Sequence, residues 1–151
     1  MRRSLSIATA ALLLSSTALA RSDNCQIHSK TYGKYDLRGL RKSSGDYEVE
    51  NTNGDVYQLN FCGPINTQAW AVDHPELVGS YQQGSSGGIS LGNVDTDPDM
   101  ERGVLSFSYT GGSACPKSSA RRATVVQLQC DNSWSSGKLQ LVKVIDECTY
   151  L

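Results

Sequence analysis

The segment GVLSFSYT, residues 103–110, decides the fold class of this chain. Large apolar residues stand at every second position, with small polar residues between them. Leu105, Phe107 and Tyr109 fall on one face, and Ser106 and Ser108 fall on the other. A period of two predicts a β-strand that is buried on one face. The segment therefore indicates a β-protein with a layered core.

Several other stretches repeat this pattern. Strands are predicted in VYQLNF (residues 56–61) and ATVVQLQC (123–130), and SYQQGSSGGISLGN (80–93) predicts two short strands with a flexible connection. KLQLVKVI (138–145) predicts a strand whose phase slips near Leu141, at a bulge. DNSWSSG is typical of a turn and GGSACPKSSARR of a longer loop. Short strands separated by turns favour an all-β antiparallel barrel or sandwich.

The first twenty residues have the features of a secretory signal. Two arginines precede an apolar run, and Ala18-Leu19-Ala20 forms an A-x-A cleavage site. We therefore expect residues 1–20 to be removed and residues 21–151 to form one domain.

The charge of the chain argues against some partners. The chain has 14 Lys and Arg against 15 Asp and Glu, and removing Arg2 and Arg3 makes it more acidic. This balance disfavours nucleic acid as a partner. The acidic stretch VDTDPDMER (residues 94–102) lacks the pattern of a calcium-binding loop, so we interpret it as a solvated loop. No metal and no cofactor is expected.

All five cysteines follow the predicted signal. They are Cys25, Cys62, Cys115, Cys130 and Cys148. An exported chain meets an oxidising compartment, so disulfides are expected. The absence of a C-x-x-C pair disfavours zinc and thioredoxin-type chemistry. Spacing alone selects no pairing, and any two bridges leave one thiol over.

Nothing in the sequence marks a catalytic centre. His28 and His74 are the two side chains that titrate near neutrality, and neither lies beside a nucleophile motif. We therefore do not expect an enzyme, and a secreted hydrolase is kept as an alternative.

A series of landmarks runs from Cys25 to the end of the chain. In order they are YDLRGL (35–40), DYEV (46–49), LNFCGP (59–64), SLG (90–92), RGVLSFSYTGGSAC (102–115), RRATVVQLQCD (121–131) and ECTY (147–150). This order resembles the mannose 6-phosphate receptor homology (MRH) domain, and the local sequence of the motifs looks most like that of the fungal receptor-type members.

The resemblance implies a flattened antiparallel β-barrel or sandwich of two sheets, braced by disulfides. It implies the bridges Cys25–Cys62 and Cys115–Cys148, and it leaves Cys130 unpaired. The family's sixth cysteine and last strand would lie after Leu151, as would a membrane anchor, so the full-length form is expected to be a single-pass membrane protein. A free Cys130 also raises the expectation of a dimer.

The resemblance also implies a mannose site made of glutamine, arginine, glutamate and tyrosine. These roles fall on Gln82, Arg122, Glu147 and Tyr150, with Gln83 and Asp146 as alternatives for the first and third. A guanidinium, a carboxylate and an amide together match the neighbouring hydroxyls of mannose. Arg121 would point to the opposite face from Arg122.

A loop for phosphate recognition is also considered. Lys117, Ser118 and Ser119 follow Cys115 and could donate to a phosphate group. Plain mannose on high-mannose glycans is the ligand that we favour, with phosphomannose left open.

The function implied is that of a lectin domain in a sorting receptor, which carries glycoproteins such as hydrolases through the Golgi, endosome and vacuole. Its partners would be mannose-containing N-glycans in the lumen of the secretory pathway. Three alternatives remain: an autophagy-related membrane protein, an endoplasmic reticulum glycan lectin, and a non-lectin interaction domain with the same fold.

Overall fold

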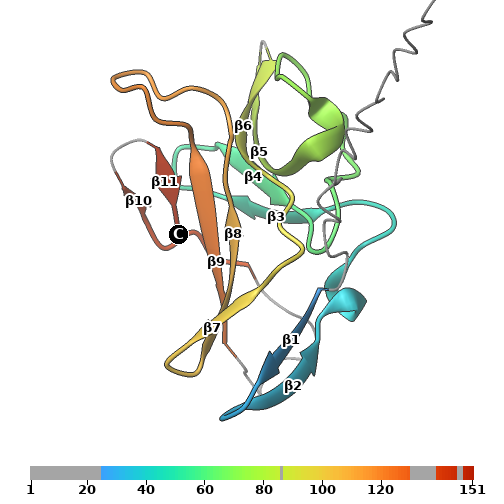
Figure 1. Cartoon of the computed structure of the whole chain (residues 1–151). Coiled ribbons are helices and arrows are strands. Elements are labelled where there is room, and N and C mark those ends of the chain that lie inside the picture. The colour runs from blue at the N-terminus through green and yellow to red at the C-terminus, as the bar shows by residue number, and fades with distance from the viewer. Residues whose placement is uncertain (1–24, 86, 130–138, 146–147) are drawn as a thin grey trace, which may run out of the picture.

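The computed structural model describes residues 25–85, 87–129, 139–145 and 148–151. In this part of the chain, strands dominate and the only helices are two single 3₁₀ turns, η1 (Arg38–Leu40) and η2 (Pro75–Leu77) (Figure 1). The strands are β1 (Gln26–Ser29), β2 (Gly33–Asp36), β3 (Tyr47–Glu50), β4 (Val56–Leu59), β5 (Val78–Gly84), β6 (Gly87–Asn93), β7 (Asp99–Glu101), β8 (Val104–Tyr109), β9 (Ala123–Leu128), β10 (Val144–Ile145) and β11 (Thr149–Tyr150). No helix among the described residues has the length and apolar character needed to cross a bilayer.

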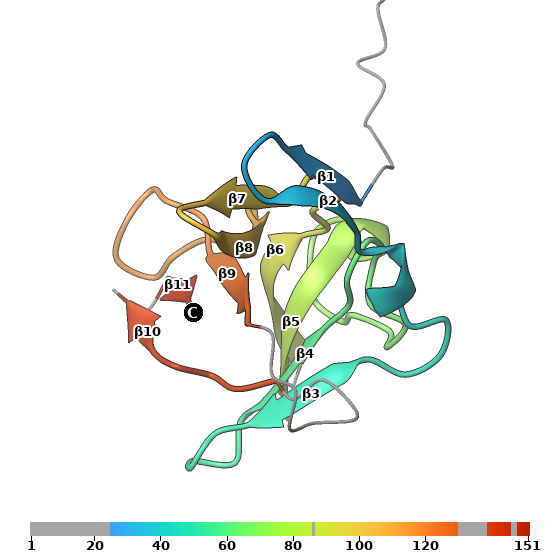
Figure 2. The ribbon, with the colours of Figure 1, turned by 90° about the horizontal axis from the view of Figure 1, so that it is seen from below.

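The strands of the described ranges form three sheets. One has the order β3-β4-β5-β6, a second has the order β10-β11-β9-β8-β7, and β1 and β2 form a separate hairpin. Figure 2 shows the two large sheets facing each other, with the hairpin across one end. Backbone hydrogen bonds join the sheets where β6 meets the segment after β8: the Asn93 amide donates to Thr110 and the Ser113 amide to Ser90.

The all-β prediction is confirmed, with two corrections. The sheets are not closed into a barrel, so a two-sheet sandwich is the correct alternative. The pairing is also not wholly antiparallel, because β11 runs parallel to β9. A long connection between these two strands allows the parallel pairing, which a tight hairpin could not form.

Most predicted strands are present. GVLSFSYT contains β8, VYQLNF contains β4, ATVVQLQC contains β9, and the glycine-rich stretch forms the hairpin of β5 and β6. GGSACPKSSARR forms the connection between β8 and β9. The predicted turn DNSWSSG lies outside the described residues.

The prediction for KLQLVKVI was largely wrong. Only Val144–Ile145 form a strand, β10, and residues 139–143 lie outside it. Lys143 still exchanges backbone hydrogen bonds with Leu151, which continues the antiparallel pairing of β10 with β11, and the Val142 amide also donates to the Leu151 carbonyl. The expected bulge at Leu141 is also absent. A register shift occurs in the other sheet, where Ser80 pairs with Gly92 and Tyr81 pairs with Ser90. Leu91 is therefore the extra residue.

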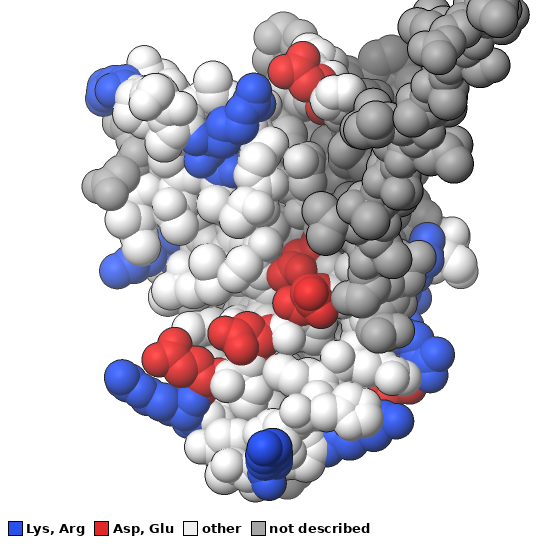
Figure 3. All heavy atoms as spheres, viewed as in Figure 1, with Lys and Arg blue, Asp and Glu red and all other residues white. Residues whose placement is uncertain are grey.

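The acidic stretch is only partly a loop. Its last two acidic residues, Asp99 and Glu101, are exposed and lie in the edge strand β7. The Asp95 carboxylate accepts hydrogen bonds from the Asp97 and Ser108 amides, at 2.8 and 2.6 Å. Figure 3 shows acidic side chains in a band over β7 and the segment that leads into it. No group of three or more potential metal ligands gathers within the described ranges.

The main core forms where β8 meets the four-stranded sheet and the N-terminal hairpin. Phe107 and Tyr109 are fully buried, and the Phe107 ring lies 5.2 Å from the Phe61 ring. Phe61 in turn meets the edge of Tyr47 at 5.1 Å. The apolar face predicted for residues 103–110 is therefore the face that packs the sandwich.

Tyr109 joins the two sheets directly. Its hydroxyl donates to the Asn60 carbonyl at 3.0 Å, and burial raises its pKa far above the ordinary value. The ring lies against Gly79, and the Tyr109 backbone lies against Gly92, so the missing side chains of both glycines make the approach possible. A Cβ on Gly79 would lie 2.6 Å from the Tyr109 ring, and Gly92 has a φ of +154° that other residues rarely adopt.

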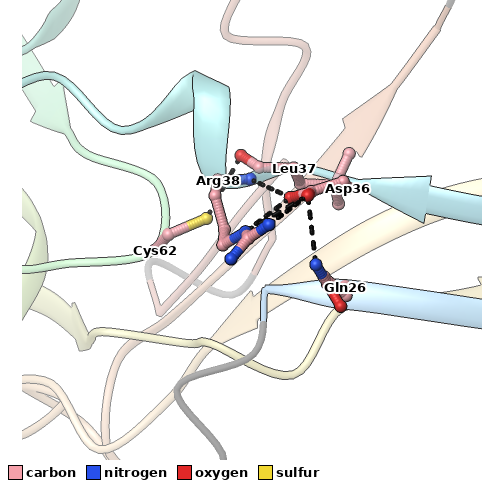
Figure 4. Close-up of polar contacts among 5 residues, drawn as sticks. All are labelled: Gln26, Asp36, Leu37, Arg38 and Cys62. Carbon is pink, nitrogen blue, oxygen red and sulfur yellow. Dashed lines mark hydrogen bonds and ion pairs between the residues drawn. The ribbon is translucent and has the colours of Figure 1, made fainter.

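The YDLRGL landmark forms the corner after β2 (Figure 4). The Asp36 carboxylate accepts from Gln26 at 3.0 Å and from the Arg38 guanidinium at 2.6 Å. Leu37 between them is buried, and its amide donates to the Cys25 carbonyl at 2.9 Å. Cys25 and Cys62 form a disulfide with a Cα–Cα distance of 5.7 Å. The corner thus attaches the hairpin to the core.

We predict that Gly92→Ala lowers the free energy of unfolding by about 1–3 kcal/mol, because the new methyl group would overlap the Tyr109 backbone. Urea unfolding followed by near-ultraviolet circular dichroism measures this. Gly39→Ala is the matched control, since nothing lies within 4 Å of its Cβ position. Equal stability of both variants would contradict the packing described.

The pKa of Asp36 provides a second prediction. The Arg38 side chain holds this pKa well below its usual range, mainly through the side-chain hydrogen bond. Any stability from this pair is present above the pKa of the unfolded state and is lost as the pH falls through the folded value. We expect Arg38→Ala to raise the Asp36 pKa toward about 3.9, as measured by carboxyl NMR titration. An unchanged titration curve would show that Arg38 is not the cause.

Candidate functional site

Arg122 and Tyr150 meet in the interior between the sheets. An Arg122 Nη1 hydrogen donates to the Tyr150 hydroxyl at 2.8 Å. The exposed fraction is 8% for Arg122 and 5% for Tyr150. Burying a guanidinium costs free energy unless oxygen atoms accept hydrogen bonds from it. The buried Arg122 side chain therefore requires acceptors such as the Tyr150 hydroxyl.

The backbone of the five-stranded sheet brings these two residues together. Tyr150 of β11 pairs with Thr124 of β9, two residues beyond Arg122. Residues two apart share one face of a strand, so Arg122 and Thr124 both face inward. Thr124 Oγ1 reaches the opposite sheet, where it contacts Ser80 Oγ at 3.1 Å and the Leu91 carbonyl at 3.2 Å.

Gln82 lies in a cross-strand row that faces this pair. It pairs with Tyr57 of β4 and with Ile89 of β6, and it is half-buried. Directly paired residues share a face, so Gln82 projects on the side of Tyr57 and Ile89. Both neighbours belong to the apolar cluster of Tyr150. The structure therefore places Gln82 on the inner face with Arg122 and Tyr150.

Tyr57 is a site residue that sequence reasoning missed. Its ring lies 5.8 Å from the Tyr150 ring, and its hydroxyl accepts from the Asn51 side chain at 3.3 Å. Burial raises the pKa of Tyr57, and the nearby Asp55 carboxylate adds to the shift. The alternating pattern of VYQLNF puts Tyr57 on one face with Leu59 and Phe61, but the pairing of Tyr57 with Gln82 is a long-range contact that carries no sequence signal.

The neighbouring residues point elsewhere. Gln83 pairs with Val56 on the other face of the four-stranded sheet. Arg121 is exposed, donates to the Gly112 carbonyl at 3.1 Å, and lines a separate cleft with His74 and Asn93. Of each adjacent pair, only Gln82 and Arg122 face the interior. Glu147 and its alternative Asp146 lie outside the described residues, as does Cys130.

The loop with Lys117, Ser118 and Ser119 is exposed and is attached to β11. The Cys115 amide donates to Ala120, and Ser118 Oγ accepts from the Ala120 amide at 3.2 Å. A disulfide joins Cys115 to Cys148, two residues before Tyr150, with a Cα–Cα distance of 5.8 Å. This bridge holds the loop near the strand that carries Tyr150. Both observed disulfides are the pairs that the resemblance implies.

The arrangement has the chemistry of a binding site for a polyol. The guanidinium donates, the tyrosine hydroxyl donates or accepts, and the amide does both. His28 and His74 are both exposed and lie outside this cluster, so neither is placed as a general base.

Residues 14–116 match the family model of the cation-independent mannose-6-phosphate receptor repeat. The chain belongs to this family. The match ends before Arg122, so it includes neither Arg122 nor Tyr150. The proteins that this chain resembles are receptors, not enzymes.

A curated relative supports this assignment. The chain is 28% identical over 132 residues to the human cation-independent mannose-6-phosphate receptor, covering 85% of this chain and 5% of the receptor. The chain thus spans a small part of that protein's length. Whether the fungal members are more similar, as the sequence landmarks suggest, stays a prediction.

Solved structures share the fold. Domain 11 of the echidna mannose 6-phosphate/IGF2R receptor has a TM-score of 0.67 at 25% identity, covering 85% of this chain and 88% of that domain. Chicken IGF2R domain 11 has a TM-score of 0.70 at 16% identity, covering 86% of each chain. The repeat fold therefore extends over nearly all of the described residues.

We predict that the double change Cys115→Ala with Cys148→Ala lowers the free energy of unfolding by about 2–5 kcal/mol. It should also increase hydrogen exchange at the Thr149 and Tyr150 amides, because the bridge holds β11 to the loop. Urea unfolding and exchange mass spectrometry measure the two effects. Full protection of β11 in the variant would show that strand pairing alone holds Tyr150.

Proposed function

We propose that this chain is a lectin domain that binds mannose-containing N-glycans of glycoproteins through Gln82, Arg122, Glu147 and Tyr150. The observation that carries the proposal is the buried hydrogen bond between Arg122 and Tyr150 on the face that Gln82 shares. A guanidinium can donate to two neighbouring sugar hydroxyls at once, while an amide and a carboxylate accept.

Family membership supports a wider role. The similar proteins are receptors whose names refer to mannose 6-phosphate. We infer that the domain acts in the lumen of the secretory pathway, in a receptor that sorts glycoproteins such as hydrolases between Golgi, endosome and vacuole. A membrane anchor outside the given sequence and a dimer through Cys130 belong to the same proposal.

The test is isothermal titration calorimetry of the disulfide-bonded chain with a high-mannose N-glycan. We expect Arg122→Ala to weaken binding roughly 10- to 100-fold, the effect of about 1.5–3 kcal/mol for a lost charged hydrogen bond. Tyr150→Phe removes the hydroxyl alone and should weaken binding less. Arg121→Ala is the matched control, because this neighbouring arginine is exposed and points away.

Thermal unfolding of each variant separates loss of binding from loss of folding. Unchanged affinity in a folded Arg122→Ala variant would favour the non-lectin interaction domain instead. Comparing plain mannose with mannose 6-phosphate tests the loop of residues 117–119. A preference for the phosphorylated sugar that disappears in Lys117→Ala would assign phosphate recognition to this loop.

A further inference from the structure

A cavity lies on the face of the four-stranded sheet opposite to the one that carries Gln82. It has a volume of about 600 Å³, within the roughly 300–1,000 Å³ typical of small-ligand sites. Its lining residues are Thr67, Gln68, Trp70, Ala71, Tyr81, Gln83, Gly84, Ser85 and Gly87. Gln83 and Tyr81 project from β5 on the face away from Gln82, so this cavity is separate from the Arg122 site.

Trp70 is exposed in this cavity although its backbone is firmly held. The residue is 61% exposed. Its amide donates to the Tyr81 hydroxyl at 3.1 Å, and its carbonyl accepts from the Gly88 amide at 3.2 Å. Tyr81 is 2% exposed and packs in an apolar cluster with Ile65, Ala69 and Val78, next to the loop between β4 and β5 that carries Trp70. The loop therefore presents a tryptophan from a rigid position.

A rigid backbone with an exposed indole is a preorganised contact. Little backbone entropy is lost when a ligand binds such a group, which is why tryptophan is frequent at binding hot spots. The residue after it, Ala71, has a φ of +58°. A non-glycine residue in this region costs free energy, which the surrounding structure must offset.

The polar groups around the indole define the ligand. Gln68 and Gln83 supply side-chain amides, and Thr67 and Ser85 supply hydroxyls. No Lys, Arg, His, Asp or Glu is among the lining residues that the structure describes. A charged ligand would lose hydration without an opposite charge to compensate. An apolar side chain would leave the amides without partners.

We propose that this cavity is a subsite for a neutral saccharide. One face of a sugar ring is a row of C–H groups that packs on the indole of Trp70. Its hydroxyls donate and accept at the same time, as the amides of Gln68 and Gln83 require. This inference does not rest on the proposed function, since the two sites occupy opposite faces of the sheet.

Tryptophan fluorescence tests the subsite directly. The chain has two tryptophans, Trp70 and Trp134, so Trp134→Phe leaves Trp70 as the reporter. Titration of this variant of the 151-residue chain with a neutral high-mannose N-glycan, and separately with N-acetylchitotriose, should change the emission in a saturable way for at least one probe. Adding Gln83→Ala should weaken that response about 10-fold or less. Failure of both probes to alter the emission would overturn the inference.

Calorimetry separates the two sites. The unmodified chain should bind the responsive probe, with Trp70→Ala removing the event reported by fluorescence and Trp70→Phe restoring part of it. Tyr32→Ala is the matched control, because Tyr32 is also an exposed aromatic residue, at 44%, but lies in the turn between β1 and β2. Its binding should equal that of the unmodified chain.

The outcomes distinguish this inference from the proposed function. If Arg122→Ala leaves the Trp70 response unchanged, the subsite is independent, as proposed. If Arg122→Ala abolishes the response while Trp70→Ala has no effect on binding, the subsite is wrong and the Arg122 site stands. If Trp70→Ala alone abolishes all binding, the subsite stands and the Arg122 site is wrong.

Discussion

The burial of Tyr109 against bare glycine backbone is the constraint on which the rest of the structure depends. Its ring fills the space at Gly79, its backbone lies against Gly92, and its hydroxyl donates to the buried Asn60 carbonyl. The Asn60 side chain in turn accepts from the Lys42 amide at 3.0 Å and donates to the Lys42 and Pro64 carbonyls. One residue of β8 therefore couples both sheets to the loops around β4. A Cβ at either glycine would overlap Tyr109 and destabilise this packing.

The alternation of strands then divides neighbouring residues between two surfaces. Gln82 faces the interior with Arg122 and Tyr150, and Gln83 faces the cavity with Trp70. Arg121 likewise lines an outer cleft. Because each sheet is thin, a strand of ordinary length can supply groups to two separate sites. Family membership concerns the fold of the whole repeat. The function of each surface must instead be inferred from the side chains that it presents.

The inner site depends on contacts between distant parts of the chain. Tyr150 reaches Arg122 through the parallel pairing of β11 with β9, and the Cys115–Cys148 bridge holds β11 to the loop before β9. Gln82 comes from the other sheet. Strands β5, β9 and β11 must therefore be aligned before the polar groups converge. The Cys115–Cys148 disulfide restricts the movement of β11, which is only two residues long.

Alternation by itself determined the all-β class and β8 with its buried face, because side-chain direction in a strand follows from local geometry. The order of landmarks determined the repeat family. Only the tertiary structure decided that the sheets form an open sandwich, that Val142 and Lys143 bond to Leu151, and that Tyr57 lies beside Tyr150. It also decided that Trp70 is exposed, since the polar neighbours and Tyr81 that hold it come from distant positions. Such contacts depend on strand register and on packing between sheets, which are long-range properties that no short stretch of residues encodes.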